Sequence, residues 1–412
     1  MTGLRRNLTE KVQQLLEVFP VVLLIGARQT GKTTFSKALQ PDWTYFDLEN
    51  EKDHDLITRD YDFFFTEYPR HIIIDEAQED PKLFRHLRGV IDAKREEKGR
   101  FILTGSSSPD LLAHASDSLA GRIAIVEIGT LKVNEVLEQS LPDFYELFSR
   151  SIVVDDTAEW LQTLSPMTDD VIPLFLKGGY PEPVLAKSDF AYSTWMENYY
   201  QTYINRDVRR LFPKLDSIRY RRFVNMLASL SGTVINKAQL GRSVDVSEVT
   251  IRDYLEIADK TYVWRTIPSY ENTPSKSILK MPKGQLRDSG LTHYLAGIEA
   301  REALLRSPQL GHNFEAFICE EIIKGIQATH VTRWDYYFYR TKNGAEVDLV
   351  LEGSFGVLPI EIKFGQKTTV KQLAALQRFV KDNNLPLGIV VNNSTEVKML
   401  AERIVQVPAG CV

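Results

Sequence analysis

The sequence predicts an α/β protein with more than one domain. Two segments of the chain alternate short β-branched runs with helix-like stretches, and this pattern is typical of a sheet flanked by helices. A helical, aromatic segment separates them, and a glycine-rich loop directly follows the first strand pattern. At 412 residues the chain also exceeds what one hydrophobic core usually supports, so we expect two to four domains.

Composition and charge narrow the class of protein. The chain is 43% hydrophobic and 25% charged, with a formal net charge of −5, so any nucleic-acid contact must come from local patches. Cys319 and Cys411 are too few and too far apart for a zinc knuckle or a disulfide framework. The N-terminus lacks an apolar segment of signal-peptide length, and no run approaches the roughly 20 residues of a membrane span. We therefore expect a cytoplasmic protein without membrane contact.

Residues 26–33 form the first candidate site. They read GARQTGKT, follow the apolar run 21–25 and precede a helix-like stretch. In such a loop backbone N–H groups close around a polyphosphate, the lysine reaches the β and γ phosphates, and the threonine hydroxyl ligates Mg²⁺. A chance match with a solvated lysine is the alternative, and the flanking strand and helix argue against it. The expected ligands of a nucleoside triphosphate with Mg²⁺ are Gly26, Ala27, Arg28, Gln29, Thr30, Gly31, Lys32, Thr33 and Thr34.

Two adjacent acids end another strand pattern, residues 71–78, which read HIIIDEAQ. Magnesium bound to a triphosphate needs a nearby carboxylate, and the attacking water needs a base or an orienting group. Asp75 fits the first role and Glu76 the second. Acids at strand ends are often merely solvated, but the loop upstream makes the catalytic interpretation the better one.

Two later positions extend this site. The strand pattern 100–103 runs into residues 104–108, where a hydroxyl, with Ser106 as our candidate, could bind the γ phosphate or the attacking water. An ordinary polar turn is the alternative. Arg122 could act as an arginine finger on a neighbouring subunit, as in ring ATPases, or could form a surface ion pair.

The middle of the chain predicts helices. Residues 166–212 form a helical lid or linker whose aromatic residues at helical spacing are better explained as core than as a stacking platform: Trp195, Tyr199, Tyr200 and Tyr203. Residues 213–300 have the order of a small winged helix-turn-helix, in which Ser247 caps the last helix.

The last helix is a poor candidate for contact with DNA phosphates, because its Arg252 lies among acidic residues. A basic stretch precedes this helix. Between residues 206 and 222, seven basic side chains stand against two acidic ones, and seven minus two gives a local charge of +5. A solvated helical face or ion pairing is the alternative to DNA binding. The candidate DNA contacts are Arg206, Arg209, Arg210, Arg219, Arg221 and Arg222.

Residues 301–412 read helix, three strands, helix, strand. Asp348 lies in the second strand, and Glu361 and Lys363 share one face of the third. Two carboxylates and an ammonium suit phosphodiester cleavage, because the acids would hold Mg²⁺ while the lysine orients or activates a water. Glu315 on the first helix could add a ligand. Charged residues on the wet face of a sheet are the alternative.

Seven motifs in order resemble a large family of prokaryotic AAA+-like ATPases whose C-terminal region is a domain of unknown function. They are GARQTGKTT, IIIDEAQ, TGSSS, SLAGR, GGYPEP, NGAEVDLV and PIEIK. The resemblance covers nearly the whole chain. It implies an ATPase domain over 1–165, the linker, the winged-helix region and, over 301–412, a domain similar to the PD-(D/E)xK restriction-endonuclease-like fold.

The resemblance also implies roles for individual residues. Lys32, Thr33, Asp75 and Glu76 match the ATP site, and the nuclease-like site matches Asp348, Glu361 and Lys363. The chain departs from the pattern at Gln29, where many AAA+ loops have a glycine, and at Val347, where the motif has a proline before the acid. The second departure leaves open whether the C-terminal domain cleaves DNA.

Two functions therefore remain open. The first is an ATPase that acts on DNA, with a magnesium-dependent nuclease for branched or otherwise structured DNA. The second is an ATP-dependent switch whose winged-helix and nuclease-like regions bind DNA or protein without cleavage. A regulatory ATPase that binds only protein is a more distant third. For each we expect a homo-oligomer, of which a ring is one form, with no small-molecule substrate beyond ATP.

Overall fold

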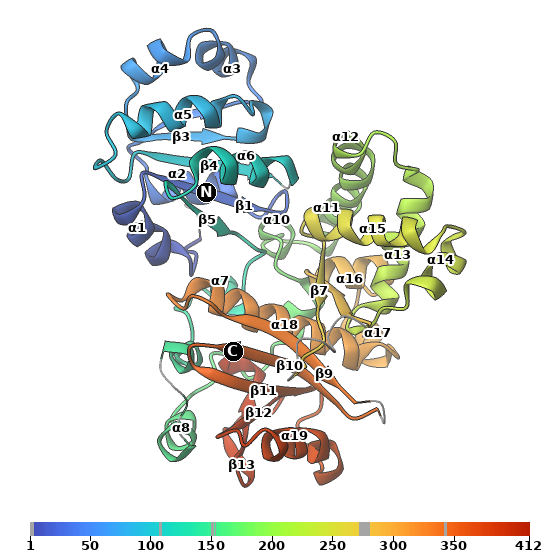
Figure 1. Cartoon of the computed structure of the whole chain (residues 1–412). Helices are drawn as coiled ribbons and strands as arrows, with labels where there is room; N and C mark the ends of the chain where they lie inside the picture. The colour runs from blue at the N-terminus through green and yellow to red at the C-terminus, as the bar shows by residue number, and fades with distance from the viewer. Residues whose placement is uncertain (1–3, 107–108, 150–151, 153, 272–280, 342–343) are drawn as a thin grey trace. The chain divides into compact units, whose positions relative to one another are not determined.

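The computed structural model describes residues 4–106, 109–149, 152, 154–271, 281–341 and 344–412, which fold into two compact units (Figure 1). The first unit is residues 1–131 with 260–262, and the second is residues 132–259 with 263–412. The first unit thus ends before the boundary expected at residue 165. Phe144, Phe148 and Leu161 belong instead to the core of the C-terminal sheet. Helical periodicity shows which face of a helix is apolar but not which sheet that face covers.

The first unit is a parallel sheet in the order β2-β3-β4-β1-β5. Its strands are β1 (Val21–Gly26), β2 (Thr44–Asp47), β3 (Ile72–Asp75), β4 (Phe101–Ser106) and β5 (Ile123–Glu127). Every residue of β1, β3 and β4 is buried, as expected for central strands covered on both faces. Because all strands run the same way, the ends of β1, β3 and β4 that carry the predicted site residues meet at one edge of the sheet.

Helices complete the first unit. They are α1 (Thr9–Val18), α2 (Lys32–Leu39), α3 (Glu51–Thr58), α4 (Tyr61–Glu67), the 3₁₀ turn η1 (Ala77–Glu79), α5 (Leu83–Asp92) and α6 (Pro109–Leu119). Leu23 of β1 and Leu103 of β4 share a buried cluster with Leu87 of α5 and Leu119 of α6.

The second unit begins with helices. They are α7 (Val133–Val136), the 3₁₀ helix η2 (Asp143–Ser149), α8 (Val154–Leu161), α9 (Ile172–Lys177), α10 (Pro181–Val184), α11 (Asp189–Thr202), the π-helix η3 (Tyr203–Val208) and α12 (Arg209–Leu211). Tyr199, Tyr200 and Tyr203 are buried in one core cluster, and Trp195 packs against it. This confirms the interpretation of the aromatic stripe as core.

Three helices and a small sheet follow. The elements are α13 (Ser217–Leu230), β6 (Thr233–Val234), α14 (Lys237–Val244), α15 (Glu248–Lys260), β7 (Trp264–Ile267), β8 (Lys283–Leu286), α16 (Ser289–Leu295) and α17 (Arg301–Arg306). The strands pair in the order β6-β8-β7, so β8 is the central strand. The hydroxyl of Ser247 accepts a hydrogen bond from the Thr250 N–H at 3.1 Å, which confirms the predicted cap.

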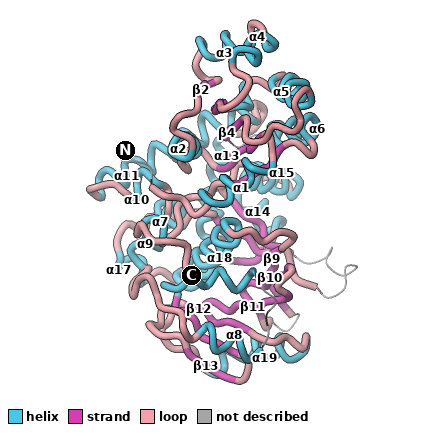
Figure 2. The backbone as a smooth tube through the Cα atoms, turned by 90° about the vertical axis from the view of Figure 1, so that its left-hand side faces the viewer, coloured by secondary structure: helices cyan, strands magenta, loops and turns pink. Residues whose placement is uncertain are grey.

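The C-terminal part is a six-stranded mixed sheet in the order β13-β14-β12-β11-β10-β9. Its elements are α18 (Leu310–Ala328), β9 (Asp335–Arg340), β10 (Glu346–Gly353), β11 (Gly356–Lys363), α19 (Val370–Asp382), β12 (Gly388–Asn392), β13 (Lys398–Ala401), β14 (Ile404–Pro408) and the 3₁₀ turn η5 (Ala409–Cys411). Residues of α18 pack on Leu349 and Ile360, and residues of α19 pack on Val347 and Val350. The two helices therefore cover opposite faces of the sheet (Figures 1 and 2).

A buried ion pair holds α18 in the second unit. The ammonium of Lys132 lies 3.1 Å from the Glu321 carboxylate and also donates to the Tyr145 hydroxyl at 2.9 Å. Both charged side chains are nearly inaccessible to water. Burial would raise the pKa of Glu321, but the charges of Lys132 and Lys324 hold that pKa below its usual value. The pair thus compensates two charges inside the core.

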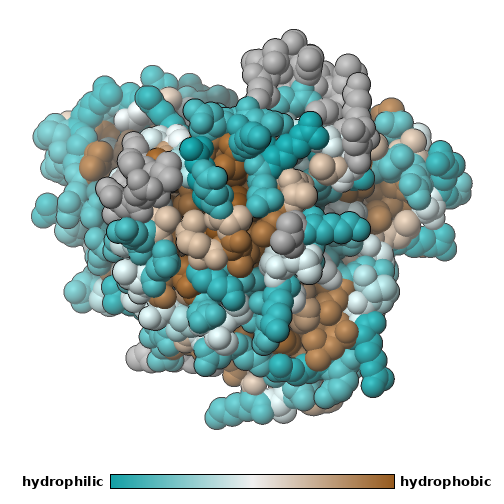
Figure 3. Space-filling view, turned by 90° about the horizontal axis from the view of Figure 1, so that it is seen from below, coloured by the Kyte–Doolittle hydropathy of each residue, from teal (hydrophilic) through white to brown (hydrophobic). Residues whose placement is uncertain are grey.

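The described helices include none that is long and apolar enough to cross a membrane. Figure 3 shows one face of the molecule, on which hydrophilic side chains predominate and hydrophobic ones gather in separate patches between them.

Candidate functional sites

The glycine-rich loop joins β1 to α2 at the carboxyl edge of the first sheet. Gly26 has a φ of +149°, and a Cβ there would lie 2.2 Å from the Ile128 carbonyl oxygen. Gly31 is the N-cap residue directly before α2 and has a φ of +87°. Both positions require glycine, because an L side chain would be strained or would clash. The buried Arg6 guanidinium donates to the Thr30 carbonyl at 2.9 Å and so holds the loop from the N-terminal side.

Lys32 is buried within this loop. Its ammonium donates to the carbonyl oxygens of Gly26 at 3.1 Å and Ala27 at 2.8 Å. Burial lowers the pKa of Lys32 to about 8, against the opposing charges of Glu76 and Asp75. A bound phosphate chain would supply the missing negative charge, so the placement suits the role expected for this lysine.

Asp75 ends β3 beside Thr33. The Thr33 hydroxyl donates to Asp75 Oδ2 at 2.7 Å, and the Tyr45 hydroxyl donates to the same oxygen at 2.7 Å. Thr104 of β4 donates to Oδ1. Burial raises the pKa of Asp75 above its usual value, although the hydrogen bonds from Thr33 and Tyr45 act to lower it. Three hydroxyls therefore fix this carboxylate next to the loop.

Glu76 follows in a strained conformation. Its φ of +53° lies in the left-handed region, which costs a residue other than glycine about 1–3 kcal/mol. Gln78 donates to Glu76 Oε2, and the Ser106 N–H lies 3.3 Å from the same oxygen. Burial alone would raise the pKa of Glu76, but the Gln78 hydrogen bond and the charge of Lys32 hold it below its usual value. Glu76 is thus an oriented, ionised carboxylate with the Ser106 backbone beside it, and contact of the Ser106 hydroxyl with a phosphate or a water stays a prediction.

The other predicted loop residues differ in burial, and their contact with a nucleotide stays a prediction. Ala27 and Thr30 are buried, whereas Gln29 and Thr34 are exposed. The Arg28 guanidinium pairs with Glu49 at 3.2 Å. Ser107 and Ser108, which belong to the same predicted hydroxyl run, lie outside the described residues.

The oxygens of Thr33 and Asp75 fit a magnesium ion. Neighbouring ligands of an octahedral Mg²⁺ with bonds of 2.0–2.1 Å lie about 2.9 Å apart. The Thr33 hydroxyl and Asp75 Oδ2 are 2.7 Å apart and belong to the two elements predicted to supply the ligands. These residues would hold the ion, which would neutralise phosphate charge when it is bound.

Arg122 does not join this site within its own chain. It precedes Ile123, which pairs with the first residue of β1, so it lies at the opposite edge of the sheet from the loop. At 3.3 Å per residue, β1 separates these edges by about 16 Å. Arg122 forms a two-pronged ion pair with Asp92, at 2.7 and 2.9 Å. Arg122 thus forms an ion pair within its own chain, which was the alternative interpretation. Its role as an arginine finger on another subunit stays a prediction.

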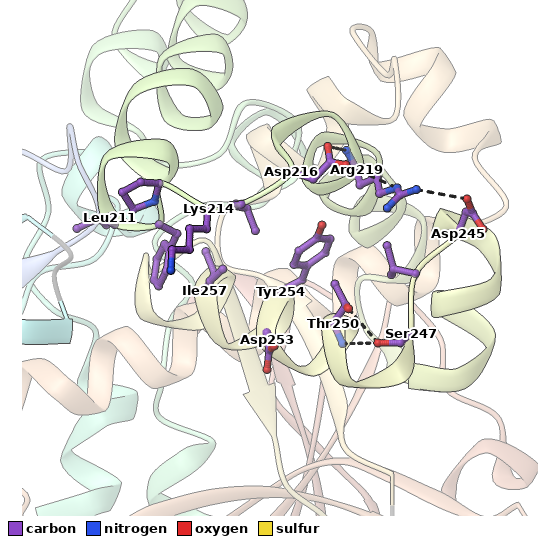
Figure 4. Close-up of a pocket in the computed structure, with 14 residues that line it drawn as sticks. Leu211, Lys214, Asp216, Arg219, Asp245, Ser247, Thr250, Asp253, Tyr254 and Ile257 are labelled. Carbon is purple, nitrogen blue, oxygen red and sulfur yellow. Dashed lines mark hydrogen bonds and ion pairs between the residues drawn. The ribbon is translucent and has the colours of Figure 1, made fainter.

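A cavity of about 850 Å³ lies between α12, α13 and α15 (Figure 4). Two residues of the basic stretch, Lys214 and Arg219, line it together with Tyr254 and others. Arg219 reaches Asp216 at 3.7 Å and Asp245 at 3.6 Å, and Arg221 donates to Asn205 at 3.0 Å. These two arginines are therefore partly engaged within the chain. The remaining candidates, Arg206, Arg209, Arg210 and Arg222, are exposed.

The C-terminal acids gather as predicted, but with an additional cation. Lys363 lies 2.7 Å from Glu361 Oε1 and 3.2 Å from Asp348 Oδ2. On the other side the ammonium of Lys283, from β8, lies 3.2 Å from Glu315 and 3.5 Å from Asp348 Oδ1. Burial would raise the pKa of Asp348, but Lys283 and Lys363 hold it low. Burial and the charge of Asp348 raise the pKa of Glu361 to about 8.

The arrangement around Lys283 does not fit a divalent metal ion. Magnesium needs oxygens at 2.0–2.1 Å from a common centre, and the centre between Glu315, Glu346 and Asp348 is an ammonium with oxygens more than 3 Å away. In the described part of the chain, no group of three His, Cys, Asp or Glu side chains is placed to hold a metal ion. The expectation that Asp348 and Glu361 ligate Mg²⁺ stays a prediction, and Lys283 compensates negative charge on the Asp348 side of this pair.

Sequence reasoning missed several residues of both sites. At the first site these are Tyr45 and Gln78, and at the second they are Lys283 and Glu346. Thr104 belongs to the predicted hydroxyl run, but its contact with Asp75 was not expected. Gln78 stands within the motif that ends in Asp75 and Glu76, so its position offered a signal. Lys283 lies far upstream of the acids, between Pro282 and Gly284, and no local pattern connects it to them.

Comparison with known proteins adds three family matches. Residues 18–137 match the family described as AAA domain. Residues 168–302 match a domain of unknown function (DUF8612), and residues 310–412 match another (DUF4143).

Similar proteins cover nearly the whole chain. Two uncharacterized proteins, one from Mycobacterium bovis and one from Mycobacterium tuberculosis, are each 32% identical over 408 residues, which is 98% of this chain and 83% of theirs. Among solved structures, a Walker-type ATPase of Pyrococcus abyssi matches with a TM-score of 0.41 and 15% identity, over 72% of this chain and 99% of that one.

Proposed function

Because this chain belongs to the same family as the two mycobacterial proteins and carries an AAA-type P-loop ATPase domain, we propose that it is an ATP-hydrolysing switch that acts on DNA. The hydrogen bond between Thr33 and Asp75, with the oriented Glu76 next in sequence, carries this proposal. It supports hydrolysis as well as binding, because a magnesium pair and a base stand together beside one phosphate loop.

Each residue has a defined task in this proposal. Lys32 and the loop backbone bind the phosphates, and Thr33 and Asp75 hold Mg²⁺. Glu76 accepts a proton from the attacking water, and Gln78 keeps its carboxylate turned toward the site. Ser106 orients Glu76 from β4.

The DNA part of the proposal rests on the second unit. We propose that residues 213–300 are a winged helix, since three helices and a sheet of order β6-β8-β7 follow the chain order of that fold. Residues 166–212 would then be a helical linker. The exposed basic side chains of α12 and α13 supply a positive local field in a chain whose net charge is −5.

Neutralising this basic surface should weaken DNA binding. The double variant Arg209→Gln/Arg222→Gln is expected to bind a duplex about tenfold more weakly at 0.1 M salt and to lower the slope of log affinity against log salt by about two units, since each lost phosphate contact removes about one. Fluorescence anisotropy across a salt series measures both quantities.

The matched control is Arg378→Gln. Arg378 is an exposed arginine of α19 that pairs with Asp382, so its replacement removes one positive charge, half of what the double variant removes, away from the basic surface. Equal affinity and slope for the double variant and the unaltered protein would remove these arginines from the DNA contact.

Cleavage is not part of this proposal. The ammonium of Lys283 within the C-terminal acids favours the alternative in which this region, similar in motif to restriction endonucleases, binds DNA or protein without cutting it. Assembly into a homo-oligomer remains compatible with the first unit. An arginine finger from Arg122 would require its ion pair with Asp92 to break.

A further inference from the structure

Lys283 stands at the centre of a closed cluster of charges. Its ammonium lies 3.2 Å from Glu315 Oε2, 3.3 Å from Glu346 Oε1 and 3.5 Å from Asp348 Oδ1. The side chain is 1% exposed. Glu315 comes from α18 and the other two acids from β10, so three carboxylates of the C-terminal domain converge on one cation from β8.

The backbone keeps this lysine in place. Residue 283 opens the central strand of the small sheet and pairs with Val234 on one side and Ile267 on the other. The ammonium therefore enters the acidic cluster from an element held by two neighbouring strands. Withdrawal of the side chain would leave the carboxylates without their main counter-charge in a buried place.

A second lysine, Lys363, also compensates the charge of Asp348. Asp348 Oδ2 accepts from the Ile362 N–H at 2.8 Å and from Lys363 at 3.2 Å, while its other oxygen faces Lys283. Both oxygens of this acid are thus engaged by groups of the chain itself. Glu361 Oε2, by contrast, is buried without a hydrogen-bond partner. Glu361 pairs with Lys363 through its other oxygen and is not among the three acids that surround Lys283.

We infer that the ammonium of Lys283 replaces the divalent metal ion of this site, so that the acids form a metal-independent ionic joint between the small sheet and the C-terminal domain. The distances support this reading, because oxygens 3.2–3.5 Å from a nitrogen surround an ammonium and not a magnesium ion. The inference concerns only the C-terminal cluster and does not depend on ATP hydrolysis or on DNA binding.

Removing the ammonium should create a metal site. Lys283→Met keeps the length of the side chain and deletes the charge, which leaves Glu315, Glu346 and Asp348 without the cation that they share. We expect this variant to bind one Mn²⁺ at least tenfold more tightly than the unaltered protein, and Lys283→Met/Asp348→Asn to lose that gain. Lys283→Arg, which keeps a cation, is the matched control and should gain nothing.

The measurement is electron paramagnetic resonance of free Mn²⁺ during titration of the nucleotide-free full-length protein. All proteins carry Asp75→Asn, so that the ATP site does not contribute. Asp348-dependent Mn²⁺ binding by the protein that retains Lys283 would overturn the inference. A folded Lys283→Met protein that gains no Mn²⁺ would overturn it as well. If Lys283→Met does not fold, comparison of the Lys283-retaining protein with its Asp348→Asn variant decides, and equal Mn²⁺ binding is the expected result.

Discussion

Glu76→Gln protein is expected to bind ATP about as tightly as unaltered protein and to hydrolyse it at least about a hundredfold more slowly. The amide keeps the size of the side chain and can still interact with Gln78, but it cannot take a proton from water. Because the carboxylate is ionised and oriented in the unaltered chain, its loss removes the base itself. Phosphate release under saturating ATP, together with nucleotide retained after gel filtration, measures both effects.

Two further variants serve as comparisons for Glu76→Gln. Lys32→Ala should weaken nucleotide binding itself, since it removes the side chain expected to contact the phosphates. Glu67→Gln makes the same chemical change at an exposed position at the end of α4 and should leave turnover unchanged. Hydrolysis by Glu76→Gln at the unaltered rate would show that another group serves as the base.

Lys132→Met is expected to destabilise the second unit by about 3–5 kcal/mol, because it leaves a buried carboxylate without its main partner. The lysine ammonium contacts Glu321 and Tyr145 inside the core, and both side chains of the ion pair are almost fully buried. Urea unfolding followed by intrinsic fluorescence gives the free energy.

The double variant Lys132→Met/Glu321→Gln tests whether the destabilisation comes from the unpaired Glu321 carboxylate. Removing both charges should restore part of the loss, since no uncompensated carboxylate then remains. Lys324→Met, which removes the other lysine beside Glu321, should cost less because that side chain is more exposed. Similar losses for both single lysine variants would contradict the special role of the buried pair.

Local sequence patterns were sufficient for much of the fold. The strand before the phosphate loop, the loop and α2 occur where expected, and the helix and three strands expected after residue 301 occur as α18, β9, β10 and β11. Each of these rests on residues adjacent in sequence, such as a β-branched run followed by glycine. Strands β13 and β14 were not predicted, and β14 is a short apolar run that ends in Pro408.

Local sequence patterns could not predict contacts between segments that are distant in sequence. The Tyr45 and Thr104 hydroxyls reach Asp75 only because β2, β3 and β4 lie next to one another in the sheet. Lys283 meets Asp348 only because two sheets of the second unit pack together. Periodicity states which face of an element is buried and not what covers it. The same limit explains the boundary at 131, where residues expected in the ATPase domain pack on the C-terminal sheet.

The dependence of DNA affinity on the bound nucleotide tests the proposed switch most directly. Duplex affinity of the Glu76→Gln protein would be measured by fluorescence anisotropy with ATP, with ADP and without nucleotide, at one salt concentration. The proposal predicts that the ATP and ADP states differ at least tenfold, which corresponds to a coupling free energy of about 1.4 kcal/mol. Salt-sensitive DNA binding of equal strength in all three states would contradict it.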